Sequence, residues 1–419
     1  MTTPDLLKEL LTAQNPADDI ALLKEALSIE SVTGNETKFA SFLGDELNAL
    51  GLSVGSGTFL DDRRNVWASN NGATDRPSLM IVGHTDTVHV RGWKEHWKDD
   101  PRSDAFAGVE QEGQIWGRGA SDLKGGICAA IAGLRLLQTA GYEPLGDITF
   151  AFIGDEESGE PGTGVSAGAK DLVCRVANGE IKKPDFAVYV EPTNVDIYTA
   201  QIGFFIADIT ITGKSAYFGK PELGIDAFKA THAILSQIWA HESELNSGPS
   251  HDLVGASSIL VTSMEGGGYI AVPGECKLSL IRKLRPGEDL YQAVKAFETA
   301  LSKAELADGI LVTIDYPAGR DHPFGGSSVE ISASDPNALL MQQCVRQALP
   351  NAGNIGGAPY WSETPFLINE IGCPAIYCAP GDIAVAHTHE ERIEVAEYLA
   401  AIRANALFVA EYCGVESKP

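Results

Sequence analysis

Five short segments of the chain place a histidine or an acidic residue at or just after an apolar run. These segments are Gly83-His84-Thr85-Asp86, Gly119-Ala120-Ser121-Asp122, Asp155-Glu156-Glu157, Val190-Glu191-Pro192 and Ala386-His387. Zinc in proteins takes imidazole nitrogens and carboxylate oxygens as ligands, at about 2.0–2.2 Å. Each segment is a weak signal alone, but together and in this order they predict a metal site.

The number of candidate ligands fits two ions. Two metal ions about 3.5–4 Å apart need a bridging carboxylate to offset their repulsion. We assign His84, Asp122 and Glu191 to one ion, and Asp122, Glu157 and His387 to the other. Asp122 is then the bridge, and the expected cofactor is a pair of zinc ions, with cobalt or manganese left open.

Two further acidic residues are predicted to assist catalysis. Asp86 follows His84 by two residues, so on an extended strand both side chains leave the same face, and Asp86 can hold the second imidazole nitrogen. Neighbouring residues of an extended chain point to opposite sides, so Glu156 and Glu157 are not expected to ligate one ion together. We therefore predict that Glu156 is the general base, which takes a proton as hydroxide attacks a carbonyl and delivers it to the departing amine.

The other histidines and the cysteines are expected to be structural. His389 is the ambiguous one, because it follows His387 by two residues. Cys373 and Cys378 flank an apolar run, and core packing is expected for them because zinc thiolate sites usually come as closely spaced pairs.

The elements that would position these residues alternate between strands and helices. Apolar runs bounded by Gly, Pro and Asp predict buried strands over 147–153, 186–190 and 375–378. Helical patterns cover 37–50, with Asn35 as its cap, and 126–140. This alternation predicts an α/β fold with a mixed, mostly parallel sheet, in which ligands bind outside the carboxyl ends of the strands.

The pattern changes near residue 203. Strands are predicted over 204–212, 258–264, 276–282 and 311–316, with helices over 225–241 and 290–303. The order strand-helix-strand-strand-helix-strand is that of a ferredoxin-like α+β domain. Since 419 residues exceed what one core usually holds, we predict a catalytic metal-binding domain formed by residues 1–202 and 319–419, with residues 203–318 inserted as a satellite domain.

Composition narrows the classes of partner. A formal net charge of −26 gives a surface that repels phosphate backbones and anionic lipids, so neither nucleic acid nor membrane is expected as a partner. The seven cysteines are few and widely spaced, and the first residues form no signal segment. No apolar stretch reaches the roughly 18 residues of a membrane span. The expected location is the cytoplasm.

Taken together, the motifs resemble the dinuclear zinc exopeptidase and deacylase family that includes acetylornithine deacetylase, succinyl-diaminopimelate desuccinylase and glutamate carboxypeptidases. The resemblance spans nearly the whole chain. It places His84 and Asp86 on the family's His-x-Asp, Asp122 on Gly-Arg-Gly-x-x-Asp-x-Lys-Gly-Gly, Glu156 and Glu157 on Glu-Glu, Glu191 on Glu-Pro-Thr, and His387 on Ala-His. The resemblance also implies a zinc-peptidase-like catalytic domain, a cis peptide after Asp122, and a satellite often used to form a homodimer.

Three positions of the predicted satellite depart from the family's motifs. Tyr217 stands where a histidine stabilises the oxyanion, Ile270 where an asparagine contacts substrate, and Lys283 where an arginine clamps a carboxylate. A tyrosine hydroxyl donates one hydrogen bond without positive charge, and losing one oxyanion donor costs about 2.7–4 kcal/mol. Lys283 keeps the charge but lacks the two-pronged guanidinium, which Arg282 or Arg285 would supply only in a different strand register.

The leading functional hypothesis is a metal-dependent amidohydrolase that removes an N-acyl group from an amino acid or a similar small amine. Glu363 lies in a segment, 361–366, that resembles the family's pocket before the last ligand, where an acidic residue could meet the substrate amine. A dipeptidase or carboxypeptidase on the same dinuclear site is the first alternative. The second is a catalytically silent zinc-binding protein, a hypothesis motivated by the absent satellite histidine.

Overall fold

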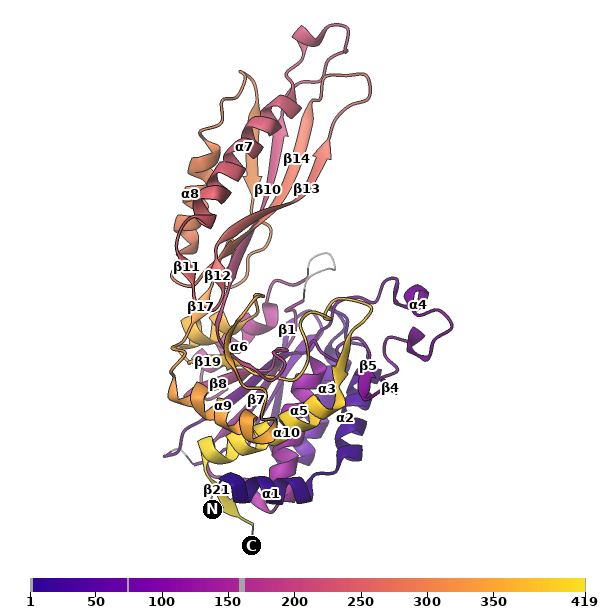
Figure 1. The fold of residues 1–419 in the computed structure, drawn as a ribbon, viewed down its shortest axis with the longest axis vertical. Coiled ribbons are helices and arrows are strands. Elements are labelled where there is room, and N and C mark those ends of the chain that lie inside the picture. Colours follow the sequence, from indigo (N-terminus) through magenta and orange to yellow (C-terminus); the bar gives the residue numbers. More distant parts are fainter. Residues whose placement is uncertain (1–2, 74, 158–162, 419) are drawn as a thin grey trace. The chain divides into compact units, whose positions relative to one another are not determined.

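The computed structural model describes residues 3–73, 75–157 and 163–418, and is drawn in Figure 1. The chain divides into two compact units. The first unit comprises Met1–Thr199, Ile331–Ala358 and Ser362–Pro419, and the second comprises Ala200–Glu330 and Pro359–Trp361. The predicted satellite, 203–318, lies within the second unit, and its independent folding as an inserted domain stays a prediction.

The main sheet has nine strands and is mixed. Its order is β1 (Ser53–Leu60), β2 (Arg63–Ser69), β7 (Ile148–Ile153), β3 (Leu79–His84), β8 (Phe186–Tyr189), β19 (Ala375–Tyr377), β9 (Ile197–Gln201) and β17 (Val329–Glu330), with β18 (Ile355–Ala358) also paired to β9. The predicted α/β fold with a mixed sheet is confirmed. Parallel pairs join β7, β3, β8 and β19 at the centre of the sheet, whereas β1, β2 and β17 pair antiparallel with their neighbours, so the parallel part is smaller than predicted.

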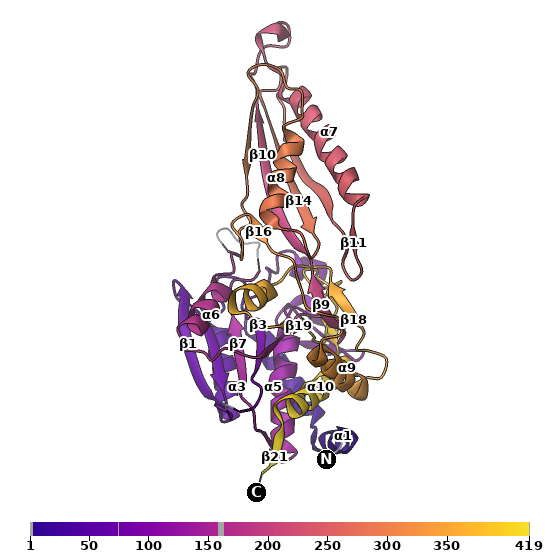
Figure 2. The ribbon, with the colours of Figure 1, turned by 90° about the vertical axis from the view of Figure 1, so that its left-hand side faces the viewer.

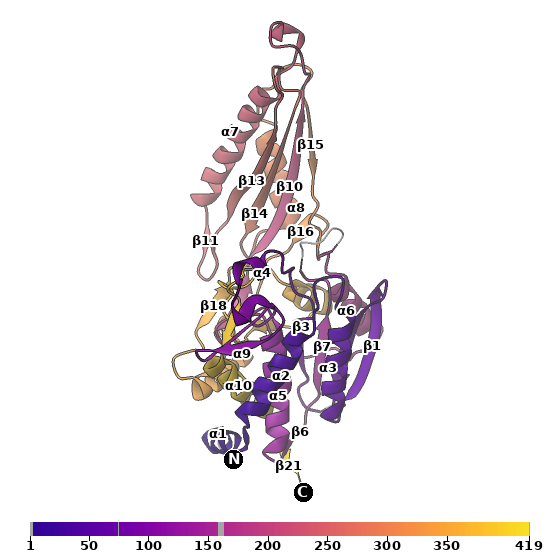
Figure 3. The ribbon, with the colours of Figure 1, turned by 90° about the vertical axis from the view of Figure 1, so that its right-hand side faces the viewer.

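Helices cover both faces of this sheet. Val66 of β2 meets Gly44 of α3 (Thr37–Ala49), whereas the next residue, Trp67, lies under Arg175 of α6 (Ala167–Ala177). Consecutive strand residues point to opposite faces, so α3 and α6 lie on opposite sides of the sheet (Figures 2 and 3). Central strands covered on both faces are continuously apolar, as in β3 and β7, where every residue is buried.

The two helices predicted from the first part of the sequence are present with small shifts. The one expected over 126–140 is α5 (Lys124–Thr139), and the one expected over 37–50 is α3. The prediction of Asn35 as the cap of α3 was wrong, because the cap position is Glu36 and its side chain makes no capping hydrogen bond. The Glu36 carboxylate instead binds the guanidinium of Arg63.

Smaller elements complete the first unit. They are α1 (Thr3–Ala13), α2 (Pro16–Ser28), α4 (Trp93–His96), η1 (Pro101–Ser103), α9 (Pro336–Ala348), the π-helical η3 (Phe366–Ile371), α10 (Val395–Cys413), a sheet of β4 (Val109–Gln111), β5 (Gln114–Trp116) and β20 (Arg392–Glu394), and a pair of β6 (Tyr142–Pro144) and β21 (Val415–Ser417). The β5–β20 pairing joins the segment before Asp122 to the segment after His387. Two candidate ligands far apart in sequence therefore share one anchor.

The second unit contains the predicted strand-helix-strand-strand-helix-strand order. Its strands β10 (Gly203–Thr212), β13 (Ser258–Gly266), β14 (Glu275–Leu284) and β15 (Leu311–Asp315) form an antiparallel sheet in the order β13-β14-β10-β15, and its helices are α7 (Ala227–Asn246) and α8 (Leu290–Leu301). Short elements are η2 (Pro221–Leu223), β11 (Ser250–His251), β12 (Gly255–Ala256) and β16 (Gly325–Gly326). Alternate residues of β10 and β14 form one core with α7 and α8, so both helices cover the same face.

Two observations bear on redox state and membranes. The seven cysteines, all in the described part of the chain, are free thiols, and all but Cys174 are buried. Among the described residues, no helix combines the length and the apolar character that crossing a bilayer requires.

Candidate metal centre

The carboxyl ends of three neighbouring strands bring acidic residues and a histidine to one edge of the sheet. His84 is the last residue of β3, Glu156 and Glu157 follow the end of β7, and Glu191 follows the end of β8. These strands run parallel side by side, so their ends meet at the same edge. Asp122 lies between β5 and α5, and His387 lies in the loop before β20.

One group of candidate ligands consists of His84, Asp122 and Glu191. The Nε2 atom of His84 lies 3.1 Å from Oδ1 of Asp122 and 3.5 Å from Oε1 of Glu191. All three side chains are buried. One potential ligand atom of each lies within 4.8 Å of the other two.

A second group consists of Asp122, Glu157 and His387. The Nε2 atom of His387 lies 2.9 Å from Oε1 of Glu157 and 3.1 Å from Oδ2 of Asp122. Asp122 thus presents Oδ1 to one imidazole and Oδ2 to the other, which is the arrangement of a bridging carboxylate. The structure brings together the five side chains that the sequence suggested as ligands, and their role as ligands is a proposal.

The electrostatics of the cluster favour a cation. Burial disfavours the charged imidazole of His84, but the carboxylates of Glu191 and Asp122 outweigh it and hold the pKa of His84 well above its usual value. Hydrogen bonds to Asp122 and Glu157 raise the pKa of His387 to about 11. Burial raises the pKa of Glu157 to about 7, with the nearby Asp122 carboxylate adding to the effect. Such a set of buried carboxylates and imidazoles suits divalent metal ions.

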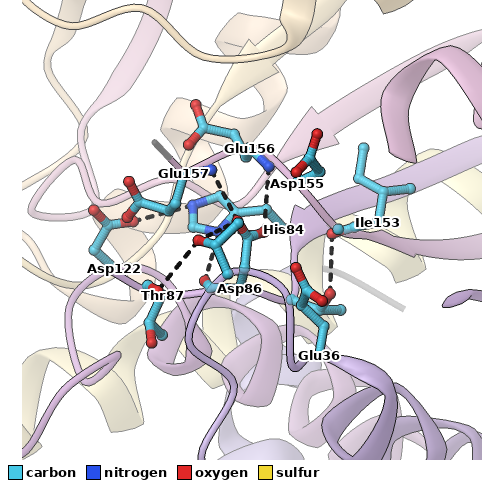
Figure 4. A network of polar contacts seen from close by, with 12 residues as sticks. Glu36, His84, Asp86, Thr87, Asp122, Ile153, Asp155, Glu156 and Glu157 are labelled. Atoms are coloured by element: carbon cyan, nitrogen blue, oxygen red, sulfur yellow. Dashed lines mark hydrogen bonds and ion pairs between the residues drawn. The ribbon is translucent and has the colours of Figure 1, made fainter. Parts of the chain in front are cut away.

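Asp86 supports the cluster, but not through the contact that the sequence suggested. The Nδ1 atom of His84 lies 3.0 Å from the backbone carbonyl oxygen of Asp86, whereas the Asp86 carboxylate is 3.8 Å from it. That carboxylate instead accepts the backbone N–H groups of Glu156 and Glu157, at 3.3 Å and 2.9 Å (Figure 4). It also accepts the hydroxyl of Thr33 at 3.0 Å. Asp86 therefore orients the imidazole through its carbonyl and the glutamate pair through its side chain.

The two glutamates are closer in space than the sequence suggested. Oxygens of Glu156 and Glu157 and a nitrogen of His84 all lie within 4.8 Å of one another. The expectation of opposite directions assumed an extended chain, but β7 ends at Ile153 and Asp155 has a φ of +75°. Burial, reinforced by Glu157, raises the pKa of Glu156 well above its usual value. Glu156 is more accessible to solvent than Glu157, which suits a base that must meet water.

A buried ion-pair network holds the turn that carries these glutamates. Arg63 of β2 contacts Glu36 and Asp155, with 2.8 Å between its guanidinium and Oδ1 of Asp155. The Asp155 carboxylate also accepts the backbone N–H groups of Gly164 and Val165, at 3.1 Å and 3.0 Å. Asp155 can therefore hold its left-handed backbone conformation, because its side chain fixes the chain on both sides of the turn.

Glu363 is a buried carboxyl group in the same unit. Its Oε2 accepts the hydroxyl hydrogen of Tyr189 at 3.0 Å, while its Oε1 has no hydrogen-bond partner among the described residues. Burial raises the pKa of Glu363 to about 8. The adjacent Ser362 donates its hydroxyl to Oε1 of Glu191 at 2.7 Å. The predicted pocket segment thus contacts a candidate ligand and also supplies an unpaired acceptor.

The three substrate positions suggested by the resemblance lie in the second unit. Tyr217 and Ile270 are exposed, at 64% and 55%, and Ile270 has a φ of +59°. The Nζ of Lys283 donates to the carbonyl of Val254 at 2.6 Å. The register of β14 places Arg282 on the buried side, paired with Glu288 at 2.7 Å, so Arg282 does not take the place of Lys283.

The sequence reasoning missed several supporting residues. Arg63 and Glu391 contact the candidate site from segments with no recognised motif, and Ser362 lies in the segment 361–366 but was given no role there. Spacing gave no signal for them, because their partners come from distant parts of the chain. The ambiguous His389 hydrogen-bonds through Nε2 to the carbonyl of Arg91, at 3.0 Å, and belongs to none of the groups above. The peptide bond between Asp122 and Leu123 is cis, as the resemblance implies.

Similarity to known proteins agrees with this geometry. The family model described as "Peptidase family M20/M25/M40" matches residues 80–411. A deformylase of Bacillus subtilis, N-formyl-4-amino-5-aminomethyl-2-methylpyrimidine deformylase, is 25% identical over 406 residues, covering 90% of both chains. Acetylornithine deacetylase of Myxococcus xanthus is 26% identical over 88% of this chain and 90% of that enzyme.

Solved structures show the same fold. The M20 family metallo-carboxypeptidase Sso-CP2 of Sulfolobus solfataricus superposes with a TM-score of 0.74 at 17% identity, covering 94% of this chain and 99% of that one. The family model covers well over half of the chain, including all the candidate ligands. The chain belongs to peptidase family M20/M25/M40 and is a hydrolase that acts on amide or peptide bonds.

Proposed function

We propose that this protein removes an N-acyl group from an amino acid or a similar small amine, using two metal ions. The observation that carries the proposal is the position of Asp122, whose two carboxylate oxygens face His84 and His387 separately. His84, Asp122 and Glu191 would hold one ion, and Asp122, Glu157 and His387 the other. The donor set fits zinc, since imidazole and carboxylate are zinc's usual nitrogen and oxygen ligands.

A bound metal pair would supply Lewis acidity that polarises the scissile carbonyl and acidifies water. The protein's own side chains carry out the proton transfers. Glu156 takes one proton from the attacking water as a C–O bond forms, and the resulting carboxylic acid returns that proton to the amine nitrogen as the C–N bond breaks. The second proton of the water stays on the acyl product, so the products are a carboxylic acid, which releases that proton to solvent, and a free amine. Burial raises the pKa of Glu156 above that of an ordinary carboxyl group, which increases its affinity for the transferred proton.

Asp86 would keep the two glutamates and His84 in fixed positions while the protons are transferred. Its carboxylate fixes the backbone of both glutamates, and its carbonyl fixes the orientation of His84. Asp86 thereby orients the proposed base, Glu156, and one proposed ligand of each ion, Glu157 and His84. Such preorganisation reduces the movement needed when charge shifts in the transition state.

Two features support an acyl-amine substrate. Two of the relatives that align with about nine-tenths of this chain are a deformylase and a deacetylase by name, and a third is a probable carboxypeptidase. Glu363 carries an unpaired carboxyl oxygen in the unit that contains the metal centre, and a substrate N–H or ammonium group would satisfy it. Tyr217, Ile270 and Lys283 stay candidates for substrate contacts, with Tyr217 as a neutral hydrogen-bond donor.

A dipeptidase or carboxypeptidase activity is the alternative, and the fold shared with a metallo-carboxypeptidase favours it. Both activities need the same ligands and the same base, so the structure of the centre does not separate them. They differ in whether the acyl group released is a simple acid or an amino acid.

The test is a hydrolysis panel. Protein stripped of metal with a chelator and reloaded with zinc would be offered formylated, acetylated and succinylated amino acids together with dipeptides, and free amine would be measured. Release from acyl-amines that depends on added zinc and is lost in Glu156→Gln supports the proposal. Release from dipeptides alone favours the alternative. Two bound metal ions without hydrolysis of either class would identify a catalytically silent metal-binding protein.

A further inference from the structure

One buried carboxylate lies between the loops that carry Asp122 and His387. Glu391 follows His387 by four residues, and its side chain is fully buried. Its Oε1 accepts the backbone N–H groups of Gly119, Ser121 and Asp122, at 3.0, 3.1 and 3.0 Å. Three donors from one turn therefore converge on a single oxygen atom.

The other oxygen of Glu391 binds Arg118, which ties the same turn to the His387 loop. The guanidinium of Arg118 contacts Oε2 of Glu391 and also donates to the backbone carbonyl of Thr388 at 3.2 Å. Thr388 is the residue after His387. The backbone carbonyl of Glu391 accepts the N–H of Gly117 at 3.2 Å, and the pairing of β5 with β20 begins next to it.

Energetics indicate that this pair is more than a stabilising contact. A buried ion pair often contributes little net stability, because removing both charges from water offsets their attraction. The three backbone N–H groups donate to a charged oxygen, and such charge-assisted hydrogen bonds are roughly twice as strong as neutral ones. At this turn they therefore offset part of the free energy lost by removing the carboxylate from water. Their direct effect is to fix the backbone of the turn that ends at Asp122, and hence the direction of the Asp122 side chain.

We propose that Glu391 is a positioning residue that brings Asp122 and His387 together. Its Oε1 fixes the backbone of Asp122, and its Oε2, through Arg118, fixes the loop that carries His387. The inference rests on the proposed metal centre and adds a residue to which no role in that centre was assigned. Partners that orient metal ligands typically change metal affinity by about 10–100-fold when removed.

The experiment compares two double variants that both remove the buried charge pair. Arg118→Met/Glu391→Gln keeps a neutral acceptor for the three N–H groups, and Arg118→Met/Glu391→Met removes it. Neither leaves a lone buried charge, so both are expected to fold, and circular dichroism of the metal-free proteins checks this. Zinc affinity is measured by competition with a chromophoric chelator, and thermal unfolding of the metal-free proteins is measured alongside.

The glutamine variant is expected to bind zinc about 10–100-fold more tightly than the methionine variant. A role in stability alone would change the unfolding temperature of the metal-free protein and leave the two zinc affinities equal, which would overturn the proposal. The matched control is Glu288→Gln in the second unit, where a partly buried glutamate also accepts hydrogen bonds from an arginine side chain and a backbone N–H, at 2.7 and 2.9 Å. This control is expected to leave zinc affinity unchanged.

The two proposals fail in different ways. If the unaltered protein binds no zinc, the proposed metal centre is wrong, and the role of Glu391 falls with it. If the unaltered protein binds two ions and hydrolyses substrate, but the double variants bind zinc equally, only the positioning role of Glu391 is wrong.

Discussion

The metal end of the first unit and the loops around Tyr217 and Ile270 in the second unit are built in opposite ways. At the metal end, buried polar side chains support one another: Ser362 holds Glu191, and Asp86 holds Glu157. In the second unit Tyr217 packs its exposed ring against Phe218, with 4.7 Å between the ring centroids. Ile270 is also exposed and has a left-handed backbone conformation.

This difference separates two kinds of functional position. A buried side chain with several partners cannot change without leaving unsatisfied polar groups, each of which costs about 1–3 kcal/mol. An exposed residue with few partners can change at little cost to folding. Two of the three departures from the family's motifs, Tyr217 and Ile270, fall on positions of the second kind, whereas Lys283 is partly buried and donates to the carbonyl of Val254. Every candidate metal ligand is retained. Changes at the metal end of the first unit should therefore alter catalysis and metal binding, and changes at Tyr217 and Ile270 should have small effects on stability.

The largest effect is expected from Glu156→Gln. Glutamine keeps the shape of glutamate but accepts no proton, so kcat should fall by about 10²–10⁴-fold, the usual contribution of general acid–base catalysis. Steady-state kinetics with zinc titration would show normal metal stoichiometry. Glu180→Gln, an exposed glutamate paired with Arg175, is the control and should keep full activity. An unchanged kcat in Glu156→Gln would show that another group is the base.

The next effect is expected from Asp86→Ala. The variant loses the carboxylate that holds Glu156 and Glu157 but keeps the carbonyl that holds His84. Affinity for the ion assigned to Glu157 should fall by about 10–100-fold, whereas the ion assigned to His84 should be affected less. Isothermal titration with zinc would resolve the two binding steps.

The control for that prediction is Asp226→Ala in the second unit. Asp226 also accepts two consecutive backbone N–H groups, those of Phe228 and Lys229 at 2.9 and 3.3 Å, but it caps α7. Its loss should lower stability by about 0.5–2 kcal/mol without changing zinc affinity. Equal zinc affinities in the Asp86 and Asp226 variants would remove the contrast between the two units.

The third prediction concerns pH. Burial raises the pKa of Glu363 from 4.5 to about 8, so the folded metal-free protein holds a proton that the unfolded chain releases. The associated stability is fully present below pH about 4.5 and is lost as the pH rises through about 8. Urea unfolding of metal-free protein between pH 5 and 8 should show this decline. Glu363→Gln should make the decline smaller without abolishing it, because Glu157, whose pKa burial raises to about 7, contributes over the same range. The change in stability should be about 0.5–3 kcal/mol.

The pKa of Glu288, in the second unit, is shifted in the opposite direction to that of Glu363. Burial raises its pKa, but hydrogen bonds from Arg282, Ser257 and the backbone of Arg285 outweigh this and lower the pKa below its usual 4.5. Its contribution to stability is present above that value and is lost as the pH falls through the lowered pKa. Glu288→Gln should therefore leave the decline between pH 5 and 8 intact, and a flattened profile in this variant would contradict the assignment.

The smallest effect is expected from Ile270→Asn. A β-branched residue at a φ of +59° is strained, whereas asparagine tolerates the left-handed region. Stability should rise by about 1 kcal/mol, measured as a higher thermal unfolding temperature. Leu223→Asn, another exposed apolar residue at 58%, is the control and should give no such gain. A loss of stability in Ile270→Asn would mean that the isoleucine side chain makes a compensating contact.

Much of the fold and the composition of the centre could be predicted from the sequence. Continuous apolar runs identified the central strands, because strands covered on both faces have no polar side. Strands β1 and β2 escaped prediction. β1 is largely exposed and contains two glycines that face Trp67 and Arg175, so it gives no clear alternation, and β2 begins with polar residues although most of it is buried. The cap predicted for α3 was wrong, because Glu36 takes the cap position and its carboxylate pairs with Arg63. The local sequence does not reveal that contact.

The sequence by itself identified the side chains that gather at the candidate metal centre. Metal chemistry restricts ligands to a few residue types, and strand ends of an α/β sheet restrict where those residues can gather. Only the tertiary structure decided how they are held. Asp86 acts through its carbonyl toward His84, and Glu391 reaches the turn of Asp122 from 269 residues away. Supporting contacts of this kind join distant segments, so their partners exist only once the chain has folded.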